Sequence, residues 1–290
     1  MAIVYPNDRA KEFGKLRDVK PAEKVQSTGY RGLDPFLQLA KKYLMIVTGY
    51  PGSGKSEFID AILINTAILH NWKTCFFSPE NNPTEEHMAK LAEKYIGMGI
   101  NGFKPKDLEN SLAWVQQYFS WAYFEDSEPT LDEIIKDINL RISDGEIDVL
   151  VIDPWNAMTH DNGNYRTDIY LGMELSKLIR FARKQGILVI VIAHPKTPQK
   201  DKNGLYPDAD MYSVTDGVMW RNKGDYGIVV KRPDMEINSI IIEIQKIKFK
   251  WMGRVGFHEL HYDRSSGRFK EIEDEEYQLP LAPGAVEPPF

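Results

Sequence analysis

The chain has 290 residues, enough for one large α/β domain, and its 42% hydrophobic and 27% charged residues are ordinary proportions for a globular protein. No apolar run is long enough to span a bilayer and the N-terminus lacks a signal-peptide pattern, so we expect no membrane contact and a cytoplasmic location. The net charge of −6 excludes a general electrostatic attraction to nucleic acid, so such binding would require a local basic patch.

The two ends of the chain differ from its middle. Residues 1–28 are polar and are predicted to form an arm or linker, and the tightly packed part is expected to start near Tyr43. Residues 271–290 are acidic and then proline-rich, which predicts a tail. The predicted functional domain spans residues 29–270.

A glycine-rich motif follows the first apolar run. Residues 49–56 read Gly-Tyr-Pro-Gly-Ser-Gly-Lys-Ser, a full match to the phosphate-binding pattern G-x-x-x-x-G-K-[ST], between a predicted strand at 43–48 and a predicted helix at 58–69. The backbone N–H groups of such a turn and the positive end of the helix surround an anion. The motif therefore predicts that the chain binds ATP, or another nucleoside triphosphate, with Mg²⁺. The predicted nucleotide-binding residues of this loop are Gly49, Pro51, Gly52, Ser53, Gly54, Lys55 and Ser56.

Within that loop two side chains have distinct expected roles. Lys55 can reach the β- and γ-phosphates, and the hydroxyl of Ser56 can bind magnesium.

The rest of the chain alternates apolar runs with helical patterns. Apolar runs without polar alternation predict buried parallel strands at 73–78, 148–153 and 187–193. From Tyr226 onward, short alternating strands predict an antiparallel addition. The predicted fold is α/β, a phosphate-loop ATPase core with a mostly parallel central sheet flanked by helices and an antiparallel C-terminal extension. Helical periodicity predicts the connecting helices at 84–95, 132–141 and 168–183.

Polar side chains stand where three predicted parallel strands end. Ligands of open parallel sheets collect at the carboxyl ends of the strands, so Glu80, Asp153 and His194 are candidate catalytic residues. A carboxylate at Asp153 can hold magnesium through water, and Glu80 can take the proton of the water that attacks the γ-phosphate. The neutral imidazole of His194 can donate to the γ-phosphate or to a water. The alternative for Asp153 and His194 is an ordinary strand-end hydrogen bond.

Two basic segments could provide the local patch that nucleic-acid binding requires. One lies in the loop at 195–204, and the other alternates along a predicted strand, which would direct its charges to one face. The alternative for both is a solvated surface. The lysines are Lys196, Lys200 and Lys202 in the loop, and Lys246, Lys248 and Lys250 in the strand.

The order of these motifs resembles the RecA-like motor domain of DnaB-type replicative DNA helicases. The pieces are the phosphate loop, strands that end in Phe-Phe-Ser-Pro-Glu80, Ile-Asp153 and Ile-Ala-His194, and a late Lys246-Ile-Lys248 before a glycine turn. The resemblance covers about residues 27–270 and is strongest to the helicase half of phage primase-helicases and to mitochondrial Twinkle. A phage protein would act in the cytoplasm of its bacterial host.

The resemblance implies roles for the strand-end residues. In that family the glutamate after the second strand is the catalytic base and the first carboxylate of the third strand serves magnesium, which implies these roles for Glu80 and Asp153. The strand-end histidine or glutamine of the family senses the γ-phosphate, as His194 would here. The following loop of the family touches single-stranded DNA with lysines, which match Lys196, Lys200 and Lys202.

Two further matches concern the neighbouring subunit and the base. Relatives carry a Lys-x-Arg pair that reaches the nucleotide of the next subunit, which implies this role for Lys246 and Lys248, and an aromatic residue that packs on the base, which implies Tyr262. The chain departs from the pattern because a lysine stands where relatives have a finger arginine, and lysine lacks the planar fork of arginine. Other candidates for the finger are Lys250, Arg232 and Arg254.

Together the resemblance implies an ATP-dependent helicase motor. Such a chain would form a homo-oligomer, expected to be a hexameric ring, that hydrolyses ATP between subunits, moves along single-stranded DNA and unwinds a duplex. A separate primase or polymerase is a candidate partner.

Two other functions fit the same core. A RecA-like recombinase or annealing ATPase would form an ATP-gated filament on DNA, which microscopy would show as open helices instead of closed rings. A monomeric phosphate-loop kinase would turn over nucleotide without DNA and would need an arginine-rich lid, which the sequence lacks.

Overall fold

The computed structural model describes residues 24–124, 128–142, 147–196, 207–215, 217–234 and 236–271, together with residues 9, 14, 15 and 202. Most of the predicted arm (1–28) and tail (271–290) therefore lies outside the described residues.

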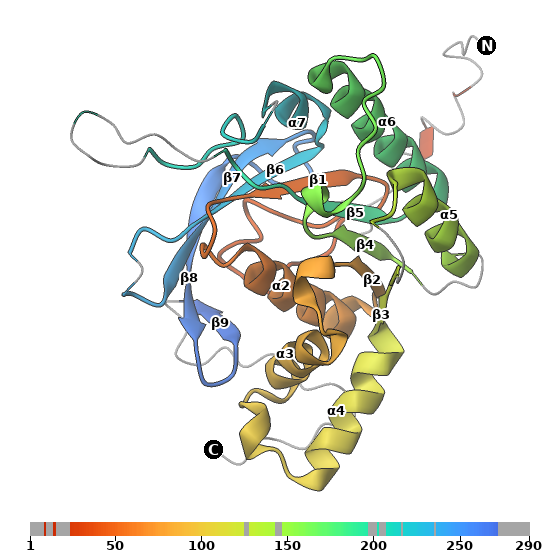
Figure 1. Cartoon of the computed structure of the whole chain (residues 1–290). Coiled ribbons are helices and arrows are strands. Elements are labelled where there is room, and N and C mark those ends of the chain that lie inside the picture. The colour runs from red at the N-terminus through yellow and green to blue at the C-terminus, as the bar shows by residue number, and fades with distance from the viewer. Residues whose placement is uncertain are drawn as a thin grey trace.

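One sheet runs through the described part of the chain (Figure 1). Its strands are β1 (Leu44–Thr48), β2 (Thr74–Phe77), β3 (Phe119–Trp121), β4 (Val149–Ile152), β5 (Leu188–Ile192), β6 (Tyr226–Lys231), β7 (Ser239–Ile247), β8 (Gly256–Asp263) and β9 (Arg268–Glu271). They lie in the order β3-β2-β4-β5-β1-β6-β7-β8-β9. The pairs from β3 to β6 are parallel, and the pairs from β6 to β9 are antiparallel. The prediction of an α/β fold with a mostly parallel sheet and an antiparallel C-terminal extension is confirmed.

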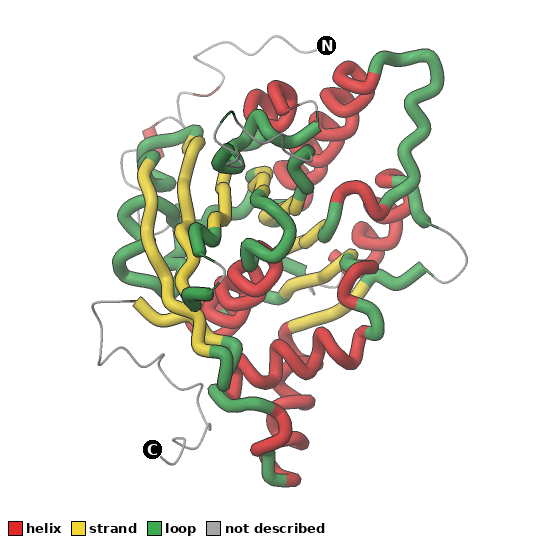
Figure 2. Tube along the Cα trace, turned by 60° about the vertical axis from the view of Figure 1, so that its left-hand side comes forward, coloured by secondary structure: helices red, strands yellow, loops and turns green. Residues whose placement is uncertain are grey.

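Helices cover both faces of the parallel part (Figure 2). The helices are α2 (Lys55–His70), α3 (Thr84–Ile96), α4 (Pro105–Tyr118), α5 (Leu131–Ile142), α6 (Thr167–Gln185) and α7 (Gly217–Lys223), with 3-10 turns η3 (Pro79–Asn81), η4 (Ile100–Gly102) and η5 (Trp155–Ala157). Residues of α2, α3 and α4 belong to one hydrophobic core, and residues of α5, α6 and α7 belong to a second.

The sheet separates these two cores. Along β1, Met45 and Val47 face the core of α2, whereas Leu44 and Ile46 face the core of α6. Side chains of a strand alternate between the faces of a sheet, so a strand covered on both sides must be apolar throughout. This explains why β1, β4 and β5 are continuous apolar runs in the sequence.

The strand β6 differs from the sequence-based expectation. The texture of the chain changes at Tyr226, and an antiparallel addition was predicted from there, but β6 pairs with β1 in parallel and the antiparallel part starts with β7. Burial explains the difference, because residues 226–230 are all buried, as in the other parallel strands.

The packed core also starts earlier than expected. Val25, Leu33 and Leu37 are buried in the core of α2, although tight packing was predicted from Tyr43. This segment is held in place by two isolated β-bridges, between Gln26 and Leu39 and between Leu37 and Gly253. It therefore ties the start of the domain to the turn between β7 and β8.

Within the described ranges, no helix is long and apolar enough to cross a membrane.

Candidate nucleotide-binding site

The phosphate loop joins the carboxyl end of β1 to α2. Gly49 has φ 150°, and a Cβ there would lie 2.2 Å from the carbonyl oxygen of Val230 on β6. Gly54 precedes α2 as its N-cap with φ 90°. Both positions require glycine, because the left-handed region and the close approach exclude a larger side chain. The loop is thus packed directly against the strand next to β1.

Lys55 lies buried within this loop. Its Nζ donates to the carbonyl oxygens of Gly49 at 2.9 Å and Tyr50 at 3.1 Å. Burial lowers the pKa of Lys55, and the nearby carboxylates of Asp153 and Glu80 act in the opposite direction. The ammonium is therefore held between the loop carbonyls and the carboxylates that follow β2 and β4.

Ser56 and Asp153 form a pair suited to a divalent cation. Ser56 Oγ donates to Asp153 Oδ2 at 2.8 Å, and the other carboxylate oxygen, Oδ1, is buried with no hydrogen-bond partner among the described residues. Burial raises the pKa of Asp153 to about 6. A hydroxyl and a carboxylate at the mouth of a phosphate loop fit Mg²⁺, which takes few protein ligands and binds phosphate oxygens as well.

The described residues contain no cluster of three or more His, Cys, Asp or Glu side chains that could hold a metal on its own.

Glu80 and His194 face each other across the ends of β2 and β5. Glu80 lies in η3 and is 57% exposed, and its Oε1 is 3.6 Å from Nε2 of His194. Burial lowers the pKa of His194 and the charge of Lys55 lowers it further, while Glu80 acts in the opposite direction; the net shift favours the neutral imidazole. The structure thus brings Glu80, His194 and Lys55 together with Asp153 and Ser56 at the carboxyl ends of the parallel strands. This is where ligands of such sheets were expected to bind.

Lys246 and Lys248 lie at the opposite end of the strands, near the amino end of β6. Lys246 pairs with Gly227 at the start of β6. Since β6 runs parallel to β1, this is the amino end of the parallel strands, whereas the phosphate loop follows the carboxyl end of β1. Lys246 Nζ donates to the carbonyl oxygens of Arg221 and Asn222, and Lys248 pairs with the buried carboxylate of Asp225. Neither lysine is placed to reach the phosphate loop of its own chain.

Tyr262 projects from β8 toward the first turn of α2. Its hydroxyl donates to Glu57 Oε2 at 3.3 Å, and the ammonium of Lys94 lies 5.9 Å from the ring centroid. Burial raises the pKa of Tyr262, and the charge of Glu57 adds to the effect. The ring therefore lies beside the residue that follows Ser56 in the chain, and its packing on a base stays a prediction.

Of the predicted DNA-binding lysines, Lys196 and Lys202 are exposed and Lys200 lies outside the described residues. The base of their loop is closed where β5 ends. Pro195 forms a β-bridge with Val214, and the backbone N–H of Lys196 donates to the carbonyl oxygen of Ser213 at 2.8 Å.

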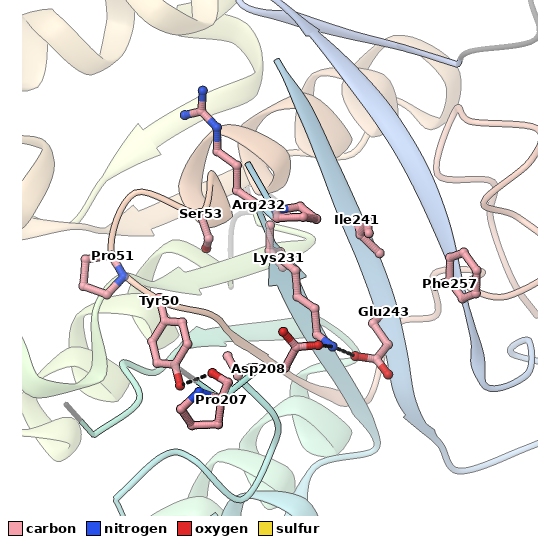
Figure 3. A pocket seen from close by; sticks show the side chains of 13 residues that line it. Tyr50, Pro51, Ser53, Pro207, Asp208, Lys231, Arg232, Ile241, Glu243 and Phe257 are labelled. Atoms are coloured by element: carbon pink, nitrogen blue, oxygen red, sulfur yellow. Dashed lines mark hydrogen bonds and ion pairs between the residues drawn. The ribbon is translucent and has the colours of Figure 1, made fainter. Parts of the chain in front are cut away.

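A cavity of about 740 Å³ lies beside the phosphate loop (Figure 3). The hydroxyl of Tyr50 donates to the carbonyl oxygen of Pro207 at 2.9 Å on one side of it. On the other side Lys231 Nζ lies between Asp208 Oδ2, at 3.0 Å, and Glu243 Oε2, at 2.8 Å.

Sequence reasoning did not single out Tyr50, Lys231 or Asp208. Tyr50 occupies a variable position of the phosphate-loop motif, so the motif gives it no role. The other two meet only because the end of β6 lies next to the segment that starts at residue 207, which is not visible in the sequence.

Comparison with known proteins agrees with this geometry. The sequence model of the AAA domain family matches residues 31–200. The Twinkle homolog protein, chloroplastic/mitochondrial, of Arabidopsis thaliana is 30% identical over an alignment of 276 residues that covers 90% of this chain. The chain spans only 37% of the length of that relative.

Solved structures share the fold at low sequence identity. One of them, a chain described as an ATPase domain, matches 94% of this chain and 100% of its own at a TM-score of 0.74 and 12% identity. A DnaB-like replicative helicase, described with its interactions with primase, matches 93% of this chain and 69% of its own at 0.72 and 13%. The RadB recombinase matches 85% of this chain and 99% of its own at 0.57 and 16%.

Proposed function

Because the chain belongs to the AAA domain family, we propose that it is the ATP-hydrolysing motor of a DnaB-type replicative DNA helicase. The observation that carries the proposal is the meeting of Lys55, Ser56 and Asp153 with Glu80 and His194 at one edge of a RecA-like sheet. The likeness to Twinkle and to a DnaB-like helicase supports a helicase over other ATPases.

The proposed hydrolysis uses residues that follow the carboxyl ends of four strands, β1, β2, β4 and β5. Lys55 and the loop N–H groups bind the phosphates, and Glu80 accepts the proton of the attacking water. His194, neutral and 3.6 Å from Glu80, donates to the γ-phosphate or to that water. Ser56 and Asp153 would hold Mg²⁺, which neutralises the charge that builds up between the β- and γ-phosphates.

We further propose that a neighbouring copy completes each site. Lys246 and Lys248 lie at the sheet edge away from the phosphate loop of their own chain, so they can stabilise the transferring phosphoryl group only on another copy. A hexameric ring is the assembly that this arrangement and the DnaB-like relatives support.

In this ring the loop at 195–204 would face single-stranded DNA. Exposed lysines in it, Lys196 and Lys202, together with Lys200, would track phosphates without reading bases. We propose that the chain acts in the cytoplasm with a separate primase or polymerase as its partner. The helicase structure that is described with primase supports the primase.

One experiment tests the proposal as a whole. ATP hydrolysis is measured with and without an oligo-dT strand, and the particle mass is measured in parallel. A DNA-stimulated ATPase in hexameric particles supports it. A monomer whose turnover ignores DNA would point to the kinase instead.

The likeness to the RadB recombinase keeps a second function open, a filament-forming ATPase on DNA. Electron microscopy of the protein with ATP and DNA separates the two, because closed rings support the helicase and open helical filaments support the recombinase.

A further inference from the structure

We propose that Tyr50 is a positioning residue that connects the nucleotide site to the DNA loop. The inference rests on the proposed function, because it assigns a residue, in addition to His194, through which the nucleotide state reaches the loop at 195–204. Tyr50 would couple the two sites mechanically and need not contact the reacting atoms.

Tyr50 makes one contact with Lys55 and one with Pro207. Its backbone carbonyl oxygen accepts a hydrogen bond from Lys55 Nζ at 3.1 Å. Its hydroxyl donates to the carbonyl oxygen of Pro207 at 2.9 Å, as Figure 3 shows. Lys55 is the group that binds the β- and γ-phosphates in the proposed site. A shift of the Lys55 ammonium toward a phosphate therefore changes the partner of the same residue that holds Pro207.

Pro207 is the first described residue of the segment that follows the loop at 195–204, the proposed DNA loop. The near side is fixed at the end of β5, by the bridge of Pro195 with Val214 and the hydrogen bond from Lys196 to Ser213. The hydroxyl of Tyr50 is the contact by which the phosphate loop holds the start of the segment at 207–214. The segment at 207–214 is thus tied to the end of β5 at one end and to the phosphate loop at the other.

A second contact on the same segment is weaker. Lys231 on β6 pairs with Asp208, but the Asp208 side chain is 84% exposed, and ion pairs in solvent contribute little. Lys231 is also held by Glu243 on β7. We therefore assign the coupling to Tyr50 and treat Asp208 as a minor support.

The first test removes only the hydroxyl. Tyr50→Phe keeps the ring, so the variant should fold, which circular dichroism and the melting temperature verify. The ratio of ATP turnover at saturating oligo-dT to turnover without DNA should fall about two- to tenfold, the range expected for losing one hydrogen bond from a coupling equilibrium. Affinity for oligo-dT should change less than twofold, because the loop lysines are intact.

Matched variants sharpen this test. Tyr123→Phe makes the same chemical change at an exposed tyrosine that follows β3, the outermost strand of the sheet, and should leave the ratio unchanged. Asp208→Asn should lower the ratio by less than twofold. An unchanged ratio in Tyr50→Phe, or an equal loss in Tyr123→Phe, would overturn the assignment.

A second measurement does not depend on DNA. Hydrogen exchange of residues 207–214 is compared with and without Mg²⁺ and a slowly hydrolysed ATP analogue. We expect the analogue to change exchange in the wild-type chain and to change it much less in Tyr50→Phe. Equal exchange responses in the two proteins would reject the coupling, whether or not DNA stimulates the wild type. A wild-type ATPase that DNA does not stimulate would count against the helicase proposal alone.

Discussion

The buried carboxyl of Asp153 links the stability of the protein to pH. Burial raises its pKa from 3.8 to about 6, so the folded chain binds a proton more tightly than the unfolded chain. The stability that this carboxyl contributes is therefore complete below about pH 4 and is lost as the pH rises through about 6. At neutral pH its negative charge is a cost that a bound cation would offset.

The variant Asp153→Asn should remove this cost, because the amide oxygen can still accept from Ser56. Without nucleotide, its free energy of unfolding at about pH 8 should exceed that of the wild type by up to about 3 kcal/mol, and the gap should close near about pH 4. Urea denaturation at the two pH values measures this. The stabilisation by Mg²⁺ and ATP that we expect of the wild type should be absent, and a variant less stable than wild type at the higher pH would contradict the argument.

Glu80 offers a separate test of the chemical step. Glu80→Gln removes the base but keeps the shape of the side chain, so nucleotide should still bind while turnover falls about 10²- to 10⁴-fold. Equilibrium binding of a fluorescent ATP analogue and steady-state hydrolysis measure the two effects. Glu86→Gln, at an exposed position of α3, is the control and should leave both unchanged.

At the scale of elements, the segment before β1 depends on close contact with the turn that follows β7. A Cβ at Gly253 would lie 2.1 Å from the carbonyl oxygen of Phe36, and the φ of Gly253 is 130°. The bridge between Leu37 and Gly253 joins these two pieces of chain. The residue must therefore be glycine for both reasons.

Gly253→Ala should lower the free energy of unfolding by roughly 2–5 kcal/mol, from backbone strain and the clash together. Gly186→Ala is the matched control, because Gly186 also has a positive φ, 75°, but has no atom within 4 Å of the added Cβ. Its cost should be about 1–2 kcal/mol. Chemical denaturation of both variants separates the clash from the strain, and equal costs would refute the close contact.

The sequence predicted the buried parallel strands well because continuous apolar runs have few alternative explanations. The predicted strand at 187–193 matches β5 to within one residue at each end. The element α4 was missed, because only Ser111, Trp114 and Val115 of its residues are buried and its apolar face is short. The three-residue strand β3 offers no period to detect.

The site residues followed from topology more than from composition. Glu80, Asp153 and His194 are far apart in the chain but lie together, since parallel neighbours deliver their carboxyl ends to one edge. The contact of Tyr50 with Pro207, and the role proposed from it, could not be predicted, because the sequence does not specify which residues come to lie beside the phosphate loop.

At the scale of the whole molecule, the phosphate loop and the lysine pair lie at opposite ends of the strands, which allows a complementation test between two variants. A Lys55→Ala chain should lack ATPase activity, and so should a Lys248→Ala chain, but a mixture should regain part of it. In mixed assemblies an intact phosphate loop meets an intact lysine pair of the other variant. Hydrolysis before and after mixing measures the effect.

The complementation test has a folding control. Lys248→Ala leaves the buried Asp225 without its ion pair, whereas Lys246→Ala removes only contacts to backbone carbonyls. Both variants should therefore be mixed with Lys55→Ala. Failure of both mixtures to regain activity, with folded chains, would refute action on a neighbour.

The loop lysines can be tested by salt dependence. Lys196→Ala with Lys202→Ala should weaken binding of oligo-dT and flatten the slope of log affinity against log salt by about 0.7 for each lysine removed. Changing two exposed lysines elsewhere, Lys106 and Lys136, should leave the slope as in the wild type. Fluorescence anisotropy at several salt concentrations measures the slopes, and an unaltered slope in the loop variant would contradict its contact with phosphates.

The position of the lysine pair away from its own phosphate loop limits how copies can associate. A contact in which the lysine pair of one protomer reaches the phosphate loop of the next uses two unlike surfaces, and repeating it head to tail builds a ring when the rotation closes. Each added copy leaves one end unsatisfied until the circle closes. Specific activity should consequently fall steeply on dilution, as closed assemblies give way to short, open-ended ones.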